Sequence, residues 1–506
     1  MKKTAFILVL LSLLSKPLGF IRQLLISYFF GATNITDAYF IASSALGIAL
    51  IYFSAVSTSF IPTYNKIQKE SGIVKANDFT NKLISIQLLL SLFMVFLIFI
   101  FADYFIVLLA SGFDQKTIEI AKKFLIILSL SAPLIVISNE LSSFLNIKER
   151  YIQKALAQYT GHIFILFVIL AGLFSYYLLA VGQVFSYFLF LLILLVLSYR
   201  QGLFFKIKLS YDENVRYAFI FAFPVVLNNS IVLINQVVDQ NIGSRLGEGV
   251  ISAINYSASL QGVLVFGIID LILTNIAFPK LSKLAQNDKS EAVLVYNKIL
   301  IALECIVIPI SFLFIFFAKD IISFVYLRGA FGSIALDNTS TVLSIISISF
   351  PFMAYSMLCT RMLFAFHISK LLIILSLVIV ISNIIFSIVL SYFFGLVGLI
   401  CGTVISSILG SCTSAIIFKY KIAKIELKKL FLKIFKIVLV CLIIVYFAYI
   451  LREQMLHYFS NEITTMIYIS VSGLLYLFLI QVVSIEEVVI LRKSVINYLR
   501  RKTINK

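Results

Sequence analysis

The stretch LLSKPLGFIRQLL (residues 13–25) lies inside an apolar run that extends from Thr4 to Phe30. A helix needs about 20 apolar residues to cross the hydrocarbon core of a bilayer, so this run is long enough to span a membrane. Its middle nevertheless carries a lysine, a proline, a glycine and an arginine. Charged side chains are costly at that depth, and they normally mark a functional site or face a wet cavity.

Similar apolar runs recur along nearly the whole chain. Of its 506 residues, 61% are hydrophobic and 13% are charged, and the mean hydropathy is +1.07. This composition excludes a soluble protein and predicts an all-α polytopic membrane protein without a sizeable water-soluble domain. The fourteen predicted spans are residues 4–30, 38–63, 83–110, 123–145, 155–174, 178–198, 217–238, 250–278, 299–318, 339–366, 371–393, 396–418, 437–451 and 464–482.

The distribution of basic residues predicts the topology. If the N-terminus is cytoplasmic, the loops and tails on that side hold 31 of the 41 Lys and Arg, and the opposite loops hold 7. The positive-inside rule therefore places both termini in the cytoplasm. The net charge of +18 is thus a topology signal, and it does not indicate a nucleic-acid partner. We expect the basic tail at 491–506 to lie on anionic lipid.

Prolines and glycines reveal an internal repeat. Pro62 and Pro279 are 217 residues apart, and Pro133 and Pro351 are 218 apart. Two further pairs have nearly the same offset: Phe113 with Phe331, and Gly182 with Gly398. The sequence therefore predicts two six-helix lobes, at 1–200 and 201–425, followed by helices 13 and 14 and a basic tail at 426–506. Two parallel repeats around a central site are typical of alternating-access transporters, although a duplicated scaffold without transport has the same pattern.

Three basic residues remain well inside the predicted spans: Lys16, Arg22 and Arg361. Lys16 lies about 18 Å along its helix, at 1.5 Å per residue, which is beyond the reach of a snorkelling lysine. Arg22 lies about 12 Å from the other end, so snorkelling remains an alternative for it. The clearest acids within spans are Glu140, Asp270 and Glu304, with Asp37 and Asp239 at span ends.

Pro17 and Gly19 accompany the two cations of the first span. Proline removes a backbone hydrogen bond, so we expect helix 1 to bend or open there and to expose carbonyl groups. Residues six apart lie about 120° round a straight helix, so the bend is also needed to align Lys16 with Arg22. A broken helix beside two cations indicates an anion site.

Three segments of the chain resemble the MurJ/MviN family of lipid II flippases, which belongs to the MOP superfamily of exporters. They are SKPLGFIRQLLISYFFGATNITDAYF (15–40), VVDQNIGSRLGEGVISAINYSASL (237–260) and RGAFGSIALDNTSTVLSIISISFPFMAYSMLCTRMLFAF (328–366). The resemblance implies fourteen helices in two lobes with a V shape, plus two extra helices that form a groove for the lipid tail. It also implies location in the bacterial inner membrane and a part in peptidoglycan synthesis, and hence in cell shape.

The resemblance also implies a substrate site. Arg22 and Asp37 match charged residues of the family's cavity, and Lys16 stands where the family usually has arginine. Arg361 is the further candidate for substrate binding. Lysine keeps the charge of arginine but loses the bidentate fork that suits a pyrophosphate.

The chain departs from the family pattern at several cavity positions. Ala49 and Ser259 stand in place of arginines, and Phe53 stands in place of a glutamate. The sodium site of some members maps to Asp239, Asn383, Thr403 and the Leu399 carbonyl, with Ser387 in place of its second acid. A neutral hydroxyl there weakens the case for sodium. We infer that headgroup recognition is altered.

Lipid II translocation is the leading hypothesis, and the chain is predicted to be a transporter without a cofactor, energised by sodium or by the membrane potential. The alternatives are a flippase for an O-antigen, capsule or other lipid-linked oligosaccharide, and a membrane-embedded glycan polymerase or ligase. Short outer loops without an acid pair disfavour the polymerase or ligase, and a basic cavity disfavours an exporter of organic cations. The expected partners are the lipid-linked glycan and membrane lipids, and cell-wall or polysaccharide synthesis proteins remain open.

Overall fold

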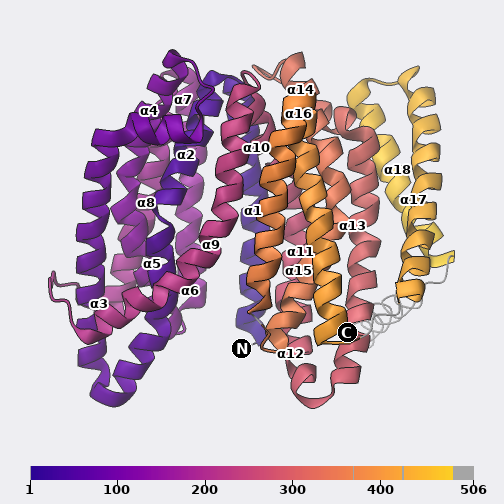
Figure 1. Cartoon of the computed structure of the whole chain (residues 1–506). Coiled ribbons are helices and arrows are strands. Elements are labelled where there is room, and N and C mark those ends of the chain that lie inside the picture. The colour runs from indigo at the N-terminus through magenta and orange to yellow at the C-terminus, as the bar shows by residue number, and fades with distance from the viewer. Residues whose placement is uncertain (1, 369, 424–426, 483–506) are drawn as a thin grey trace, which may run out of the picture. The chain divides into compact units, whose positions relative to one another are not determined.

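The computed structural model describes residues 2–368, 370–423 and 427–482. All regular secondary structure in these ranges is helical (Figure 1). The chain forms two compact units: unit 1 is Met1–Tyr256 with Arg328–Ala335, and unit 2 is Ser257–Leu327 with Leu336–Lys506. The predicted basic tail at 491–506 lies outside the described residues.

Unit 1 contains the first ten helical elements and the start of the eleventh. They are α1 (Lys2–Phe30), α2 (Asn34–Ala49), α3 (Ile51–Leu109), α4 (Gln115–Ser129), α5 (Ser131–Ile147), α6 (Tyr151–Gln158), η1 (Tyr159–Ile163), α7 (Phe164–Leu173), α8 (Leu178–Arg200), α9 (Glu213–Arg245) and α10 (Val250–Gln261). Its core includes the buried rings of Phe60, Tyr64, Phe79 and Phe144, from α3 and α5.

Unit 2 contains the end of α10 and the remaining helices. They are η2 (Gly262–Phe266), α11 (Gly267–Ile272), η3 (Leu273–Ala277), α12 (Phe278–Asn287), α13 (Lys289–Tyr326), α14 (Ser333–Ile346), η4 (Ser347–Ser349), α15 (Phe350–Ala365), α16 (Leu371–Lys421), α17 (Leu427–Leu456) and α18 (Asn461–Val482). Helices α17 and α18 lie side by side and pack on α13 (Figure 1).

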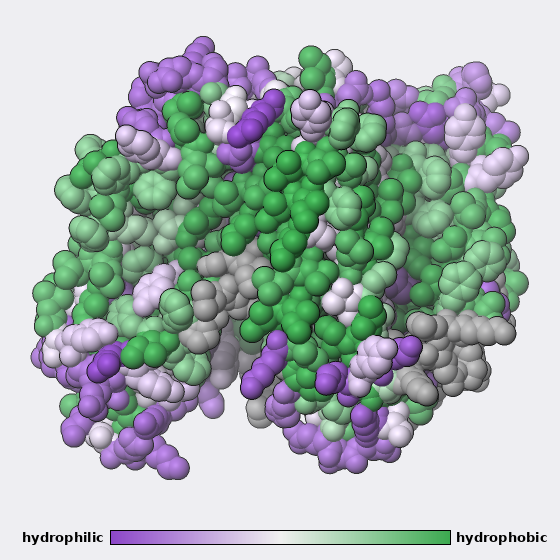
Figure 2. All heavy atoms as spheres, viewed as in Figure 1, coloured by the Kyte–Doolittle hydropathy of each residue, from purple (hydrophilic) through white to green (hydrophobic). Residues whose placement is uncertain are grey.

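Eleven helical segments of the described chain are long and apolar enough to cross a membrane. Two of them, α3 with 59 residues and α16 with 51, are too long for one crossing of a core about 30 Å thick. Each has a glycine with positive φ inside it, Gly72 at 84° and Gly395 at 57°, where the chain direction changes. The surface in view is hydrophobic across its middle and hydrophilic at its ends (Figure 2), as in a multi-pass membrane protein. The count of fourteen spans stays a prediction.

The internal repeat has structural counterparts in the two units. Pro133 lies just after the junction of α4 and α5, and Pro351 lies just after the junction of η4 and α15. Gly182 packs against the Phe167 side chain of the preceding helix, and Gly398 packs against the backbone of the preceding half of α16. A glycine at such a position lets two neighbouring helices approach closely.

The first helix corrects one expectation. The sequence predicted a bend or an opening at Pro17 and Gly19. The opening is wrong, because α1 is one continuous helix from Lys2 to Phe30 with Pro17 inside it, and the bend stays a prediction. Pro17 removes only the hydrogen bond to the Leu13 carbonyl, and membrane helices tolerate such a loss when neighbouring helices pack against them. Here α6, η1 and α7 pack along α1 and support it.

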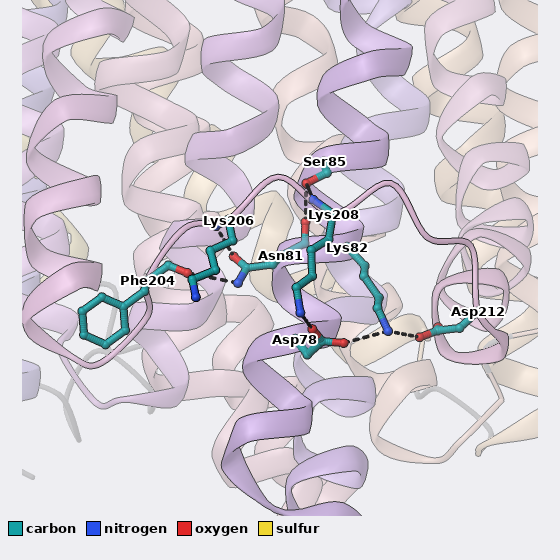
Figure 3. A network of polar contacts seen from close by, with 8 residues as sticks. All are labelled: Asp78, Asn81, Lys82, Ser85, Phe204, Lys206, Lys208 and Asp212. Carbon is teal, nitrogen blue, oxygen red and sulfur yellow. Dashed lines mark hydrogen bonds and ion pairs between the residues drawn. The ribbon is translucent and has the colours of Figure 1, made fainter.

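Side chains of α3 form hydrogen bonds with the connection between α8 and α9 (Figure 3). Asn81 donates from Nδ2 to the Phe204 carbonyl at 3.0 Å and accepts the Lys206 amide at Oδ1 at 3.3 Å. One helical turn further on, the Ser85 hydroxyl accepts the Lys208 amide at 2.9 Å. Polar residues four apart lie on one face of α3, so they meet every second residue of an extended segment.

Ion pairs extend the same network (Figure 3). The Lys82 ammonium lies 2.7 Å from Asp78 and 3.0 Å from Asp212, and Lys208 also pairs with Asp78. The hydrogen bonds from Lys208 and Lys82 hold the pKa of the Asp78 carboxyl below its usual value, in the connection between two predicted spans. Asp212 also caps α9 by accepting the Val215 amide at 3.0 Å. These hydrogen bonds and ion pairs join α9 to unit 1, so this compact unit extends past the predicted lobe boundary at 200/201.

Candidate functional site

Two neighbouring pockets of unit 1 lie along one side of α1. Lys16 lines one of them and Arg22 lines the other. Ser15 and Gln158 line both pockets, so the two cations face adjoining spaces. The sequence predicted that a bent helix is needed to align these cations. The structure brings them to adjoining pockets on an unbroken helix, because residues from α5, α6, η1, α7 and α8 also line the two pockets.

The lysine pocket, defined by Lys16, has a volume of about 370 Å³. Its lining residues are Leu8, Leu11, Ser12, Ser15, Lys16, Asn146, Tyr151, Lys154, Ala155, Gln158 and Tyr159. The Tyr159 hydroxyl donates to the Leu11 carbonyl at 2.5 Å, and this bond fixes α1 against η1. Ser15 Oγ lies 3.1 Å from His162 Nε2. The pocket therefore holds two cationic side chains among hydroxyl and amide groups.

The arginine pocket, defined by Arg22, has a volume of about 380 Å³. Its lining residues are Ser15, Arg22, Gln158, Gly161, Phe164, Gln183, Ser186, Tyr187 and Phe190. The Arg22 guanidinium carbon lies 5.4 Å from the centre of the Phe164 ring, within the range of a cation–π contact. In the described part of the chain, no carboxylate forms an ion pair with Arg22. The Tyr39 hydroxyl donates to Gln183 Oε1 at 2.6 Å and orients this amide.

Asp37 lies in neither pocket and is buried, with 1% of its surface exposed. Its Oδ2 accepts the Gly249 amide at 2.7 Å, and its Oδ1 accepts the Ser252 amide at 2.7 Å and the Ser252 hydroxyl at 2.5 Å. These amides belong to the start of α10, where unpaired amides and the helix dipole favour a negative charge. Asp37 therefore caps a helix that is more than 200 residues away in the sequence.

The three sequence motifs that carry the family resemblance meet around this cap. The Ala330 amide donates to the Tyr28 carbonyl at 2.8 Å, and the Tyr256 hydroxyl donates to the Gly31 carbonyl at 2.5 Å. Gly31 has a φ of 62°, and a Cβ at this position would collide with the Ala330 carbonyl. The motifs thus hold three distant segments of unit 1 together.

Arg361 belongs to α15 of unit 2. Its Nη2 lies 3.7 Å from Asp270 Oδ1 on α11, and both side chains are partly exposed. The Asp270 carboxylate thus partly neutralises the charge of Arg361, whereas no carboxylate among the described residues pairs with Arg22. Two other acids within predicted spans are buried. Glu140 accepts Ser57 at 2.7 Å and Gln87 at 2.8 Å, and Glu304 is 3% exposed.

The predicted sodium ligands are divided between the units. Asp239 belongs to unit 1, whereas Asn383 and Thr403 belong to unit 2. Asn383 Nδ2 donates to Thr403 Oγ1 at 3.2 Å, and its buried Oδ1 has no hydrogen-bond partner within the described chain. The Leu399 carbonyl accepts the Ser387 hydroxyl at 3.4 Å. The predicted ligands in unit 2 are therefore neutral oxygen atoms and include no carboxylate. The sodium site stays a prediction.

Several pocket residues were not predicted from the sequence. Lys154 resembles the many other cations predicted on the cytoplasmic side, and Gln158, Gln183 and Tyr187 are uncharged. The spacing of Lys154 and Gln158 was a usable signal, because residues four apart place polar groups on one face of a helix. Of the departures from the family pattern, Phe53 is 6% exposed and belongs to the packed interior.

An apolar groove lies between α13, α17 and α18 in unit 2. It has a volume of about 620 Å³. Its lining includes Ile306, Pro309, Leu313, Ile444, Gly473 and Leu477. The groove thus offers an elongated hydrocarbon ligand a surface without charged side chains.

A family model described as lipid II flippase MurJ matches residues 26–470. Among curated relatives, a probable lipid II flippase MurJ of Aquifex aeolicus is 26% identical over 346 residues, which cover 67% of each chain. A probable lipid II flippase MurJ of Buchnera aphidicola is 24% identical over 498 residues, which cover 94% of this chain and 96% of the relative.

Solved structures have the same fold. One described as lipid II flippase MurJ in an inward closed conformation superposes with a TM-score of 0.81 at 24% identity, covering 95% of this chain and 99% of its own. Multidrug resistance MATE family transporters of the MOP superfamily match at TM-scores of 0.61 (inward-facing) and 0.57 (outward-facing). Their identities are 16% and 15%, and they cover 80% and 82% of this chain and 94% and 95% of their own.

Proposed function

Since the chain belongs to the MurJ family of lipid II flippases, we propose that it carries lipid II from the cytoplasmic to the outer leaflet by alternating access. The single observation that carries this proposal is the family match from residue 26 to 470. The protein is a transporter and not an enzyme. Its fold, shared with MATE transporters described as inward-facing and outward-facing, supports the alternating-access part of the proposal.

The headgroup site is assigned to the two pockets of α1. The pyrophosphate of lipid II carries about two negative charges, and hydrogen bonds to charged groups contribute about 1.5 to 3 kcal/mol each. Lys16 and Arg22 supply positive charge in adjoining pockets, and the neutral amides of Gln158 and Gln183 suit the uncharged sugars. Asp37 is assigned to the cap of α10, and Arg361 stays a secondary candidate because it faces Asp270.

The polyprenyl tail is assigned to the apolar groove between α13, α17 and α18. The groove is lined almost entirely by hydrocarbon, which favours a lipid chain over a polar ligand. This assignment gives a role to α17 and α18, which contain the last two predicted spans and have no counterpart in the sequence repeat.

Filling the groove should weaken tail binding. A Cβ at Gly473 meets no atom within 4 Å, so Gly473→Leu is accommodated by the fold and projects into the groove. If leucine displaces about two tail methylenes at about 0.8 kcal/mol each, affinity for lipid II falls roughly tenfold. Binding to the detergent-solubilised protein measures the effect. Gly473→Ala is the matched control and should bind as wild type, and wild-type affinity in Gly473→Leu would contradict the tail assignment.

We place the protein in the bacterial inner membrane with both termini in the cytoplasm. The excess of Lys and Arg in the loops on one side supports this orientation. For the energy source, Ser387 in place of the second acid of the predicted sodium site favours the membrane potential over sodium. Interaction with other proteins of cell-wall synthesis stays a prediction.

A flippase for another lipid-linked oligosaccharide is the second candidate. Ala49, Phe53 and Ser259 stand where the resemblance predicts charged residues, and this observation favours an altered headgroup. Vesicles containing the purified protein distinguish the two candidates. Transport of lipid II supports the first, whereas transport of an O-antigen lipid in the absence of lipid II transport overturns it. Rescue of a cell depleted of its essential lipid II flippase is the corresponding test in vivo.

A further inference from the structure

We propose that Lys154 is a second phosphate-binding lysine of the headgroup site, and that it and Lys16 hold the diphosphate of the substrate between them. This inference rests on the proposed function and adds a specificity-determining residue to it. Lys154 belongs to α6 and Lys16 to α1, and both line the lysine pocket. A pocket of about 370 Å³ has room for a diphosphate group.

The surroundings of Lys154 leave its charge unneutralised. Its Nζ donates to Asn146 Oδ1 at 3.2 Å, and this acceptor is neutral. Within residues 2–368, 370–423 and 427–482, no carboxylate lies within ion-pair distance of Lys154. Other cations of the chain have such partners: Lys82 pairs with Asp78 and Asp212, and Arg452 lies 2.5 Å from Asp320. An external anion is therefore the missing partner of Lys154.

Asn146 orients the site toward an anion. Because its Oδ1 accepts the lysine proton, its Nδ2 remains as a donor on the same amide group. The half-buried ammonium and this amide thus present donors from one side of the pocket, and Lys16 presents its ammonium from α1. Donors that converge from separate helices suit a diphosphate, whose acceptor oxygens are spread over two phosphorus atoms.

The lysine pair also accounts for a departure from the family pattern. Ala49 and Ser259 stand where the resemblance predicts cavity arginines, so the chain lacks two of the expected positive charges. Lys154 restores one of them from a helix that the resemblance does not assign to the site. Lysine binds phosphate as a point charge and not through a bidentate fork, so two lysines can each serve one phosphate group.

The test measures binding of two probes to the full-length protein in detergent: a polyprenyl diphosphate without glycan, and phosphatidylglycerol. Lys154→Gln should weaken diphosphate binding about tenfold or more, because one charge-assisted contact is lost. Lys154→Arg keeps the charge and should restore most of the affinity. Lys69→Gln removes an exposed lysine of α3 that lines neither pocket, and it should bind both probes as wild type.

Each outcome decides the proposal. Selective loss of diphosphate binding in Lys154→Gln, with rescue by Lys154→Arg, supports the lysine pair. Unchanged diphosphate binding in Lys154→Gln overturns it, and so does an equal loss for phosphatidylglycerol, which would indicate a general site for anionic headgroups. If the wild-type protein binds the diphosphate through Lys154 but does not transport lipid II, the proposed function is wrong. The assignment of diphosphate binding to Lys154 and Lys16 then remains supported.

Discussion

Replacing Lys16 and Arg22 together by alanine should abolish lipid II translocation. Both cations face the adjoining pockets of α1, and no carboxylate among the described residues pairs with Arg22. Two charge-assisted contacts at about 1.5 to 3 kcal/mol each correspond to a loss of roughly 100-fold or more in affinity for the diphosphate. Each single substitution should cost about tenfold or more, because the other cation remains in the neighbouring pocket.

Flipping of fluorescent lipid II in vesicles measures this effect. Lys16→Arg and Arg22→Lys, which keep the charge, should retain most of the activity. The thermal unfolding midpoint should stay near that of the wild type, because both side chains are at least partly exposed. Wild-type flipping by a correctly inserted double variant would contradict the assignment of the headgroup to α1.

Asp37→Ala should destabilise unit 1 strongly. The substitution removes the acceptor for the Gly249 and Ser252 amides and leaves both amides buried, whereas the Ser252 hydroxyl keeps Thr36 Oγ1 as an acceptor at 2.7 Å. Unsatisfied buried donors cost about 1 to 3 kcal/mol each, so we expect a loss of about 3 kcal/mol or more in the free energy of unfolding. Asp37→Asn keeps the shape but loses the charge and one acceptor oxygen, so its loss should be intermediate.

Unfolding of the purified variants in detergent measures this loss. Asp103→Ala is the matched control, because Asp103 forms an exposed ion pair with Lys122 at 2.5 Å and such pairs contribute about 1 kcal/mol or less. The folded fraction of Asp37→Ala should still bind a polyprenyl diphosphate with wild-type affinity. If Asp37→Ala has wild-type stability but no longer binds the diphosphate, Asp37 contributes to substrate binding and not to stability.

Much of the fold and part of the site were predictable from the sequence. Apolar runs of crossing length identify a multi-pass membrane protein because hydrocarbon tolerates few unpaired polar groups. The repeat was visible because prolines and glycines are constrained by local geometry, and Pro133 and Pro351 indeed lie at equivalent helix junctions. Lys16 and Arg22 were identified as cavity residues because a charge so deep in an apolar run needs a polar environment.

Other features depended on packing. Local chemistry predicted a broken helix at Pro17, but neighbouring helices support an unbroken α1. Lys154 looks like any other basic residue beside a span, and only the packing of α6 on α1 brings it to the pocket of Lys16.

The sequence by itself determined the membrane class, the internal repeat and the two cations of α1, because hydrophobicity, backbone constraints and burial costs act locally along the chain. The tertiary structure alone decided which groups meet. Asp37 shows the difference: the family resemblance implied a substrate contact, and the structure shows that it caps α10 through amides that lie 212 and 215 residues further along the chain. Such partners are selected by the packing of distant helices, which no local pattern in the sequence records.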